Sequence, residues 1–161
     1  MSLPGHNNPP LTTKEIIEKN INRKKPILDR EPQFFNGVPI PSWIELSLID
    51  VCNRDCSFCP KSDENISPNT YMKMEQVLVE KLIFDLKKIN FEGSFTMCGY
   101  GEPLLHPNIL EIVNSIGKFW GIEIVTNGDP LTKKKLKELY NSKVSKLVVS
   151  MYDGPEQIVK F

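Results

Sequence analysis

From residue 43 onward, the chain alternates between two patterns of apolar and polar residues. Short apolar or alternating runs at 44–49, 94–98, 122–125 and 146–150 have the length and pattern typical of β-strands. Between these runs, apolar residues recur at steps of three and four over 74–89, 107–120 and 132–142, which predicts amphipathic helices. Strands alternating with helices in this way predict a parallel sheet with right-handed crossovers.

The first 42 residues have a different pattern, which predicts an N-terminal arm. Thr12 and Glu15 have the spacing of a capping box, so we expect a helix from about residue 13 to Arg23. Beyond it, prolines keep the chain extended up to the first strand: Pro26, Pro32, Pro39 and Pro41. We therefore divide the chain into an arm, 1–42, and a core domain, 43–161.

Composition and charge exclude several classes of protein. The 161 residues suffice for one domain, and 20 basic residues balance 20 acidic ones, so nothing indicates binding to nucleic acid or to an anionic membrane. We expect no membrane-spanning helix and no secretory signal, because the chain lacks a long apolar run and its first residues lack a basic segment. The four cysteines are therefore expected as thiols or ligands in the cytoplasm.

Three of these cysteines follow the first predicted strand directly. Cys52, Cys56 and Cys59 have the spacing C-x3-C-x2-C, on a loop at the strand end where α/β proteins place their chemistry. Soft thiolates select zinc or iron–sulfur clusters, and three nearby thiolates leave one position of a cluster open. One hypothesis is therefore a cluster with an open iron. A second is a structural zinc module with Cys98 or His106 as its fourth ligand.

Each later strand is also followed by polar side chains or by glycines whose backbone N–H and C=O groups are exposed. Gly99–Glu102 follows the second strand, Asn127 the third, and Ser150 with Asp153 the fourth. Because the carboxyl ends of parallel strands share one edge of a sheet, these groups are expected on one rim with the cysteines. His106 is expected as the N-cap of the following helix, with Pro107 at its first position.

Taken together, these residues resemble the motifs of the radical S-adenosylmethionine (radical SAM) superfamily. The loop Cys52-x-x-x-Cys56-x-Phe58-Cys59 resembles its cluster loop, and Gly99-Tyr100-Gly101-Glu102-Pro103 is similar to its second motif. The stretches Thr126-Asn127-Gly128 and Ser150 to Gly154 resemble further features of the family.

The resemblance implies a [4Fe–4S] cluster on Cys52, Cys56 and Cys59, whose fourth iron takes S-adenosylmethionine. It implies reductive cleavage of this cofactor to a 5′-deoxyadenosyl radical and hydrogen abstraction from a peptide, sugar or small metabolite, with an electron donor such as flavodoxin or ferredoxin. No residue is assigned a catalytic role. The residues implied to form the cofactor site are Phe58, Gly99, Tyr100, Gly101, Glu102, Asn127, Ser150 and Asp153.

The resemblance also implies an α/β fold, a partial (β/α)6 barrel. The chain has room for about four parallel β/α units of the expected six, so we expect an incomplete barrel that ends within a helix around residues 156–159. Such a core would be truncated at its C-terminus, so we expect this chain alone to bind a cluster poorly and turn over little. A catalytically inactive interaction fragment is the third hypothesis.

Overall fold

The computed structural model describes residues 12–154 and 157, which belong to two compact units that divide after Glu31. The described part of the first unit is the helix α1 (Thr13–Leu28). It begins as predicted, with the capping box in which Thr12 Oγ1 accepts from the Glu15 amide and Glu15 Oε2 accepts from the Thr12 amide at 2.7 Å. The predicted end at Arg23 is wrong. The helix continues through Pro26, and the Asp29 amide closes its last turn on the Lys25 carbonyl at 2.9 Å.

The second unit begins with a hairpin that the proline-based prediction missed. The strands β1 (Gln33–Phe35) and β2 (Val38–Ile40) pair antiparallel across a two-residue turn at Asn36 and Gly37. Both turn residues have positive φ, 50° and 79°, as hairpin turns of this type require. Pro39 is tolerated because a two-stranded ribbon leaves outward backbone positions without a partner strand. The Asn-Gly pair between apolar residues was the signal for this turn.

The four strands predicted for the core, and the three helices predicted between them, are all present. The parallel sheet has the order β3-β4-β5-β6, with β3 (Trp43–Leu46), β4 (Ser94–Met97), β5 (Gly121–Thr126) and β6 (Lys146–Val149). The main helices between these strands are α2 (Gln76–Lys88), α3 (Ile109–Ile116) and α4 (Lys133–Tyr140). None of the helices described is long and apolar enough to cross a membrane.

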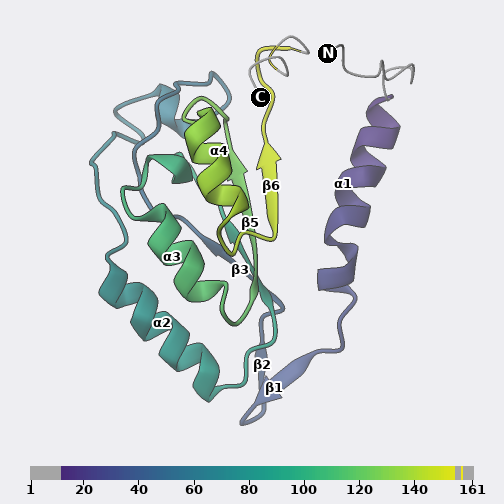
Figure 1. Ribbon diagram of the computed structural model, residues 1–161. Coiled ribbons are helices and arrows are strands. Elements are labelled where there is room, and N and C mark those ends of the chain that lie inside the picture. The colour runs from purple at the N-terminus through teal and green to yellow at the C-terminus, as the bar shows by residue number, and fades with distance from the viewer. Residues whose placement is uncertain (1–11, 155–156, 158–161) are drawn as a thin grey trace. The chain divides into compact units, whose positions relative to one another are not determined.

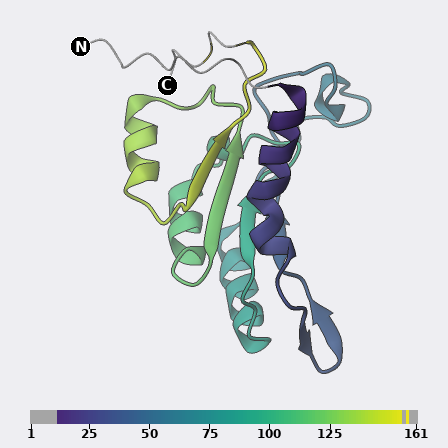
Figure 2. The same cartoon turned by 90° about the vertical axis from the view of Figure 1, so that its right-hand side faces the viewer.

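The strand order places the helices on one face of the sheet. Each strand pairs with its predecessor in the chain, and right-handed crossovers between neighbours then all pass on the same side. Figures 1 and 2 show α2, α3 and α4 against the same face of the sheet. This is the arrangement of an α/β barrel, here an open sheet of four described strands, which agrees with the expected incomplete barrel. Its core includes Leu48, Val79, Phe95, Met97, Ile112, Ile122 and Ile124.

The segment before α3 differs from the prediction. A short 3₁₀ turn, Pro103–Leu105, comes first, and α3 begins at Ile109 with Asn108 as its N-cap, so Pro107 is not the first helical residue. His106 ends the 3₁₀ turn, and its Nδ1 accepts from the Asn108 amide at 3.1 Å. Its Nε2 faces the Met74 carbonyl at 3.1 Å. Because Nδ1 accepts a hydrogen bond, the ring proton is on Nε2, which donates to the Met74 carbonyl. Burial lowers the pKa of His106. Of the helix expected around residues 156–159, the structure describes only Gln157.

Candidate functional site

One cavity at the carboxyl ends of the strands brings together the chemistry predicted from the sequence. Its volume is about 100 Å³, and all three cysteines of the C-x3-C-x2-C loop line it. Residues from the ends of β4, β5 and β6 complete the wall. The predicted residues that line it with the cysteines are Phe58, Gly99, Tyr100, Gly101, Glu102, Asn127 and Ser150, whereas Asp153 is not part of the lining. Arg54, Cys98, Val125, Thr126 and Tyr152 also line it.

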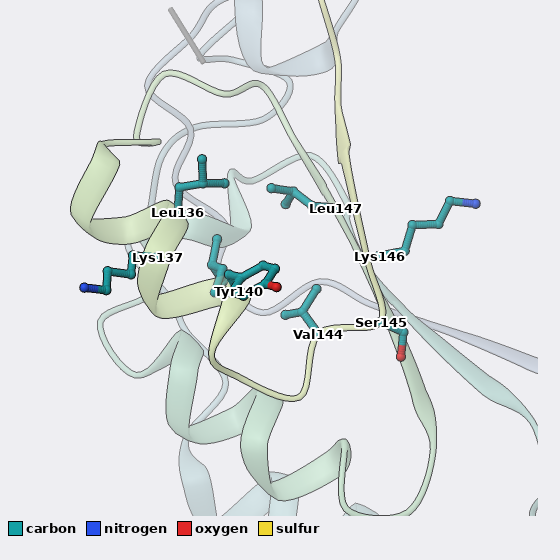
Figure 3. A pocket seen from close by; sticks show the side chains of 8 residues that line it. Leu136, Lys137, Tyr140, Val144, Ser145, Lys146 and Leu147 are labelled. Atoms are coloured by element: carbon teal, nitrogen blue, oxygen red, sulfur yellow. The ribbon is translucent and has the colours of Figure 1, made fainter.

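A second cavity, of about 690 Å³, lies between α4 and β6 and has a different character. Figure 3 shows Leu136 and Tyr140 of α4 on one side of this cavity. They face Val144, which precedes β6, and Leu147, which belongs to it. Its wall is mainly apolar and contains no cysteine, histidine or carboxylate. The first cavity is therefore the candidate functional site.

Local hydrogen bonds shape the cysteine loop. The Cys59 amide donates to the Cys56 carbonyl at 2.8 Å, which makes a tight turn between the second and third cysteines. The Cys52 amide donates to Asn69 Oδ1 at 3.1 Å, and the Asn127 side-chain amide lies 3.8 Å from Cys52 Sγ. All three cysteines are free thiols and half-buried.

The thiols are close enough to influence one another. Burial raises the pKa of the Cys52 thiol, and Glu102, Cys56 and Cys59 raise it further through their negative charge. A metal bound by Cys52 would therefore have to supply the positive charge that favours its thiolate form.

The two residues named as a fourth zinc ligand have different positions. His106 uses both ring nitrogens on backbone groups, the Asn108 amide and the Met74 carbonyl, each at 3.1 Å. Cys98 lines the cavity with the other cysteines. Among the described residues, no group of three or more histidine, cysteine, aspartate or glutamate side chains is arranged to hold a single metal ion. Of the two, only Cys98 therefore lies where a metal ligand would be needed.

Glu102 connects the ends of three strands from a buried position. Its side chain is 2% exposed, and its Oε1 accepts from the Leu104 amide at 3.0 Å and from the Thr126 hydroxyl at 2.6 Å. Its Oε2 accepts from the Asn127 amide at 2.8 Å, and its own amide donates to the Val51 carbonyl at 2.9 Å. The carboxylate thus meets three protein donors, and it fixes the backbone at Asn127.

The two glycines before Glu102 are required by close packing against the chain that follows β3. Gly99 has φ +131°, and a Cβ there would lie 2.5 Å from Ser47 Oγ. A Cβ at Gly101 would lie 1.9 Å from the Ile49 carbonyl oxygen. Tyr100 stands between them with 63% of its surface exposed. In this motif the two glycines therefore pack closely against the chain after β3, whereas Tyr100 exposes its ring to solvent.

Sequence reasoning missed Arg54, which lies between the first two cysteines. Its guanidinium binds Asp129 through Nε at 2.6 Å and Nη2 at 2.7 Å, and Asp153 through Nη1 at 2.9 Å and Nη2 at 2.7 Å. The hydrogen bonds to Asp129, and then those to Asp153, raise the pKa of Arg54. The sequence signalled Arg54 only as a cation placed between cysteines. Its two partners follow β5 and β6, far away in the sequence, so no local pattern could identify them.

An aromatic pair stands beside this arginine. The rings of Phe58 and Tyr152 lie 5.3 Å apart, and the Arg54 guanidinium carbon lies 5.8 Å from the Tyr152 ring centre. Phe58 is 71% exposed and Tyr152 is 48% exposed, so both rings offer free surface beside the cysteines.

Comparisons with known proteins identify a family to which the chain is similar. The family model described as Radical SAM superfamily matches residues 46–160. The S-adenosyl-L-methionine-dependent 2-deoxy-scyllo-inosamine dehydrogenase of Niallia circulans is 32% identical over 116 residues, covering 70% of this chain and 46% of that protein. A GTP 3',8-cyclase of Aquifex aeolicus is 32% identical over 124 residues, covering 71% of this chain and 36% of the cyclase.

The fold is similar to that of a solved structure. The crystal structure of BtrN in complex with AdoMet and 2-DOIA superposes with a TM-score of 0.64 at 30% identity, covering 77% of this chain and 48% of that one. The chain thus spans about half the length of this protein and of the dehydrogenase, and about a third of the length of the cyclase.

Proposed function

The chain belongs to the radical SAM superfamily, and from this membership we propose that it forms the cluster-binding part of a radical SAM enzyme. In this proposal Cys52, Cys56 and Cys59 hold a [4Fe–4S] cluster and leave its fourth iron for S-adenosylmethionine. The single observation that carries the proposal is that these three cysteines share one cavity with residues from the end of every parallel strand described. When bound, the cluster supplies the electron that cleaves the cofactor to a 5′-deoxyadenosyl radical for hydrogen abstraction.

The residues present fit such a cluster. Thiolates are the ligands that iron–sulfur clusters prefer, and three of them would leave one of the four irons of the cluster without a protein ligand. The cavity of about 100 Å³ is smaller than the usual ligand pocket of about 300–1,000 Å³. We therefore interpret it as the floor of a larger site.

The residues around the cysteines have proposed roles toward S-adenosylmethionine. We propose that the exposed ring of Phe58 contacts the adenine. We propose that the backbone of Gly99, Tyr100 and Gly101, which lines the same cavity, binds the methionine amino group. Asn127 and Ser150 offer polar groups for the ribose or the carboxylate.

Two of the residues predicted for the cofactor site act on it indirectly in this proposal. Glu102 holds the Asn127 backbone through the hydrogen bond at 2.8 Å. Asp153 holds Arg54. Their carboxylates therefore set the shape of the site through the residues that line it.

The substrate, the electron donor and the compartment are also proposals. The two relatives are named for chemistry on 2-deoxy-scyllo-inosamine and on GTP, so we propose a small hydroxylated metabolite over a peptide. A flavodoxin or a ferredoxin would supply the electron. A reducing cytoplasm suits four free cysteines.

Anaerobic reconstitution with iron and sulfide tests the cluster. A brown, air-sensitive protein that contains iron would support the cluster. Because the chain alone is expected to bind the cluster poorly, we expect fewer than the roughly four irons per chain of full occupancy. Serine at any of positions 52, 56 and 59 should abolish the cluster, whereas Cys98→Ser, a matched control within the same cavity, should retain it. A colourless protein that keeps zinc, and loses it with Cys98→Ser, would instead establish the zinc module.

Turnover separates an active enzyme from an inactive fragment. We expect the purified 161-residue chain to produce little or no 5′-deoxyadenosine when the cluster is reduced in the presence of S-adenosylmethionine. Cluster binding without turnover would fit the interaction fragment, and steady turnover would show that the described strands suffice.

A further inference from the structure

The strongest charged contacts at the site belong to Arg54, which the proposed chemistry does not use. Its guanidinium makes four hydrogen bonds of 2.6–2.9 Å to two carboxylates, and its side chain is only 15% exposed. Asp129 receives two of these bonds on separate oxygens, and Asp153 receives the other two in the same way. Such two-pronged pairing suits the planar fork of arginine and cannot be reproduced by lysine.

The two carboxylates come from different strands. Asp129 lies three residues beyond β5, and Asp153 lies four residues beyond β6. Arg54 therefore ties the cysteine loop, which follows β3, to the far side of the sheet. No other described contact of the loop reaches the end of β6 with comparable charge.

Neighbouring contacts reinforce this connection. Asn53 Nδ2 donates to Asp129 Oδ2 at 3.0 Å, and Asn53 Oδ1 accepts from the Asn127 side chain at 3.0 Å. On the other side, the Asp153 amide lies 3.3 Å from Gln157 Oε1, and the Gln157 Nε2 lies 3.4 Å from the Asn127 carbonyl. Both anchors of Arg54 are thus held by further hydrogen bonds that lead back to Asn127.

We propose that Arg54 is a positioning residue that holds the cysteine loop in its metal-binding geometry, with Asp129 and Asp153 as its anchors. The role of the cysteines as ligands rests on the proposed function, but the tethering of the loop does not. Cys52 and Cys56 stand on either side of Arg54, so release of the arginine frees both thiols to move. The side chain of Asp153 then serves the site by holding Arg54.

Thiol alkylation of the metal-free chain tests the tether directly. Iodoacetamide labelling, quantified for each cysteine by mass spectrometry, should run at least about tenfold faster at Cys52 and Cys56 in Arg54→Met than in the wild type. Loss of one charged hydrogen bond is worth about a tenfold factor in a local opening equilibrium, and this variant loses four, so tenfold is a lower bound. Arg54→Lys keeps one charge but loses the fork, so its rate should lie between the two. Rates within twofold of the wild type for Arg54→Met would overturn the proposal.

The anchors and a control sharpen this test. Asp129→Asn should raise the labelling rate more than Asp153→Asn, because the Asp129 side chain is 30% exposed and that of Asp153 is 49% exposed. Lys134→Met is the control. It also removes one positive charge, from the exposed pair in α4 in which Lys134 Nζ lies 3.9 Å from Glu138 Oε1, and it should leave the labelling rate of the cysteines unchanged. A rise as large in Lys134→Met would overturn the proposal by showing an effect of charge alone.

A double-mutant cycle covers the case in which Arg54→Met perturbs the whole fold. If Arg54 acts through Asp129, the variant with both changes should label no faster than Arg54→Met alone. Urea unfolding should show that the single variants remain folded under the labelling conditions. Fully additive effects would overturn the proposal. Iron retention against a chelator gives a separate readout. A chain that takes up no iron would overturn the proposed function and leave the labelling result standing.

Discussion

Replacing Glu102 with glutamine tests how the ends of β4 and β5 are held together. The side chain is 2% exposed and accepts three hydrogen bonds, from the Leu104 amide, the Thr126 hydroxyl and the Asn127 amide. Glutamine has nearly the same shape, but one of its terminal atoms is a donor. If its oxygen keeps the bonds to Leu104 and Thr126, its NH₂ group faces the Asn127 amide, donor against donor.

The cost follows from these contacts. Hydrogen bonds to charged groups contribute about 1.5–3 kcal/mol each, and a buried donor left unsatisfied costs about 1–3 kcal/mol. Glu102→Gln weakens two bonds by removing the charge and loses the third outright. We therefore expect a loss of about 2–4 kcal/mol in the free energy of unfolding, a large part of the 5–15 kcal/mol typical of a domain.

Urea unfolding followed by circular dichroism measures this change. Glu80→Gln, on the exposed side of α2, is the matched control and should change the free energy by less than about 0.5 kcal/mol. A loss below about 0.5 kcal/mol for Glu102→Gln would refute the reasoning, because three buried contacts would then contribute nothing to stability.

Three further predictions follow from single contacts. Gly101→Ala places a Cβ 1.9 Å from the Ile49 carbonyl oxygen and should cost about 3 kcal/mol in urea unfolding, whereas Gly121→Ala, with 3.6 Å to its nearest neighbour, should be tolerated. The pKa of His106 is lowered in the folded state, so its stabilising effect is present above about pH 6.5 and is lost as the pH falls through the folded pKa. Urea titrations from pH 7.5 to 5 should show this loss in the wild type and less of it in His106→Asn, and equal slopes would contradict it. Lys61→Met removes a buried ammonium that donates to a loop carbonyl at 2.8 Å, so limited proteolysis within residues 60–70 should become faster; an unchanged rate would argue against this anchoring role.

Two of the predictions that failed concern hydrogen bonds that compete locally. The hairpin of β1 and β2 was missed because four prolines were given more weight than the Asn36-Gly37 turn between Phe35 and Val38. The start of α3 was placed too early because Pro107 is a common first helical residue, whereas Pro103 already begins a 3₁₀ turn whose hydrogen bonds end at His106. In both cases the sequence offered two compatible local structures, and the surrounding contacts selected one.

By itself, the sequence determined the order of strands and helices, the parallel sheet and the rim on which the polar groups gather. The strands and helices follow from the spacing of apolar residues, which is a local property of the sequence. The rim then follows because the carboxyl ends of parallel strands share one edge of the sheet. It also determined which three thiols stand together, because Cys52, Cys56 and Cys59 lie on one short loop.

Only the tertiary structure decided how the rim is held together. Arg54 meets Asp129 and Asp153 across 75 and 99 residues of sequence, and Glu102 meets Asn127 across 25. Such pairs depend on the register of β3, β4, β5 and β6 and on which face each side chain takes. No local pattern encodes these features, because they are fixed only when the whole sheet packs.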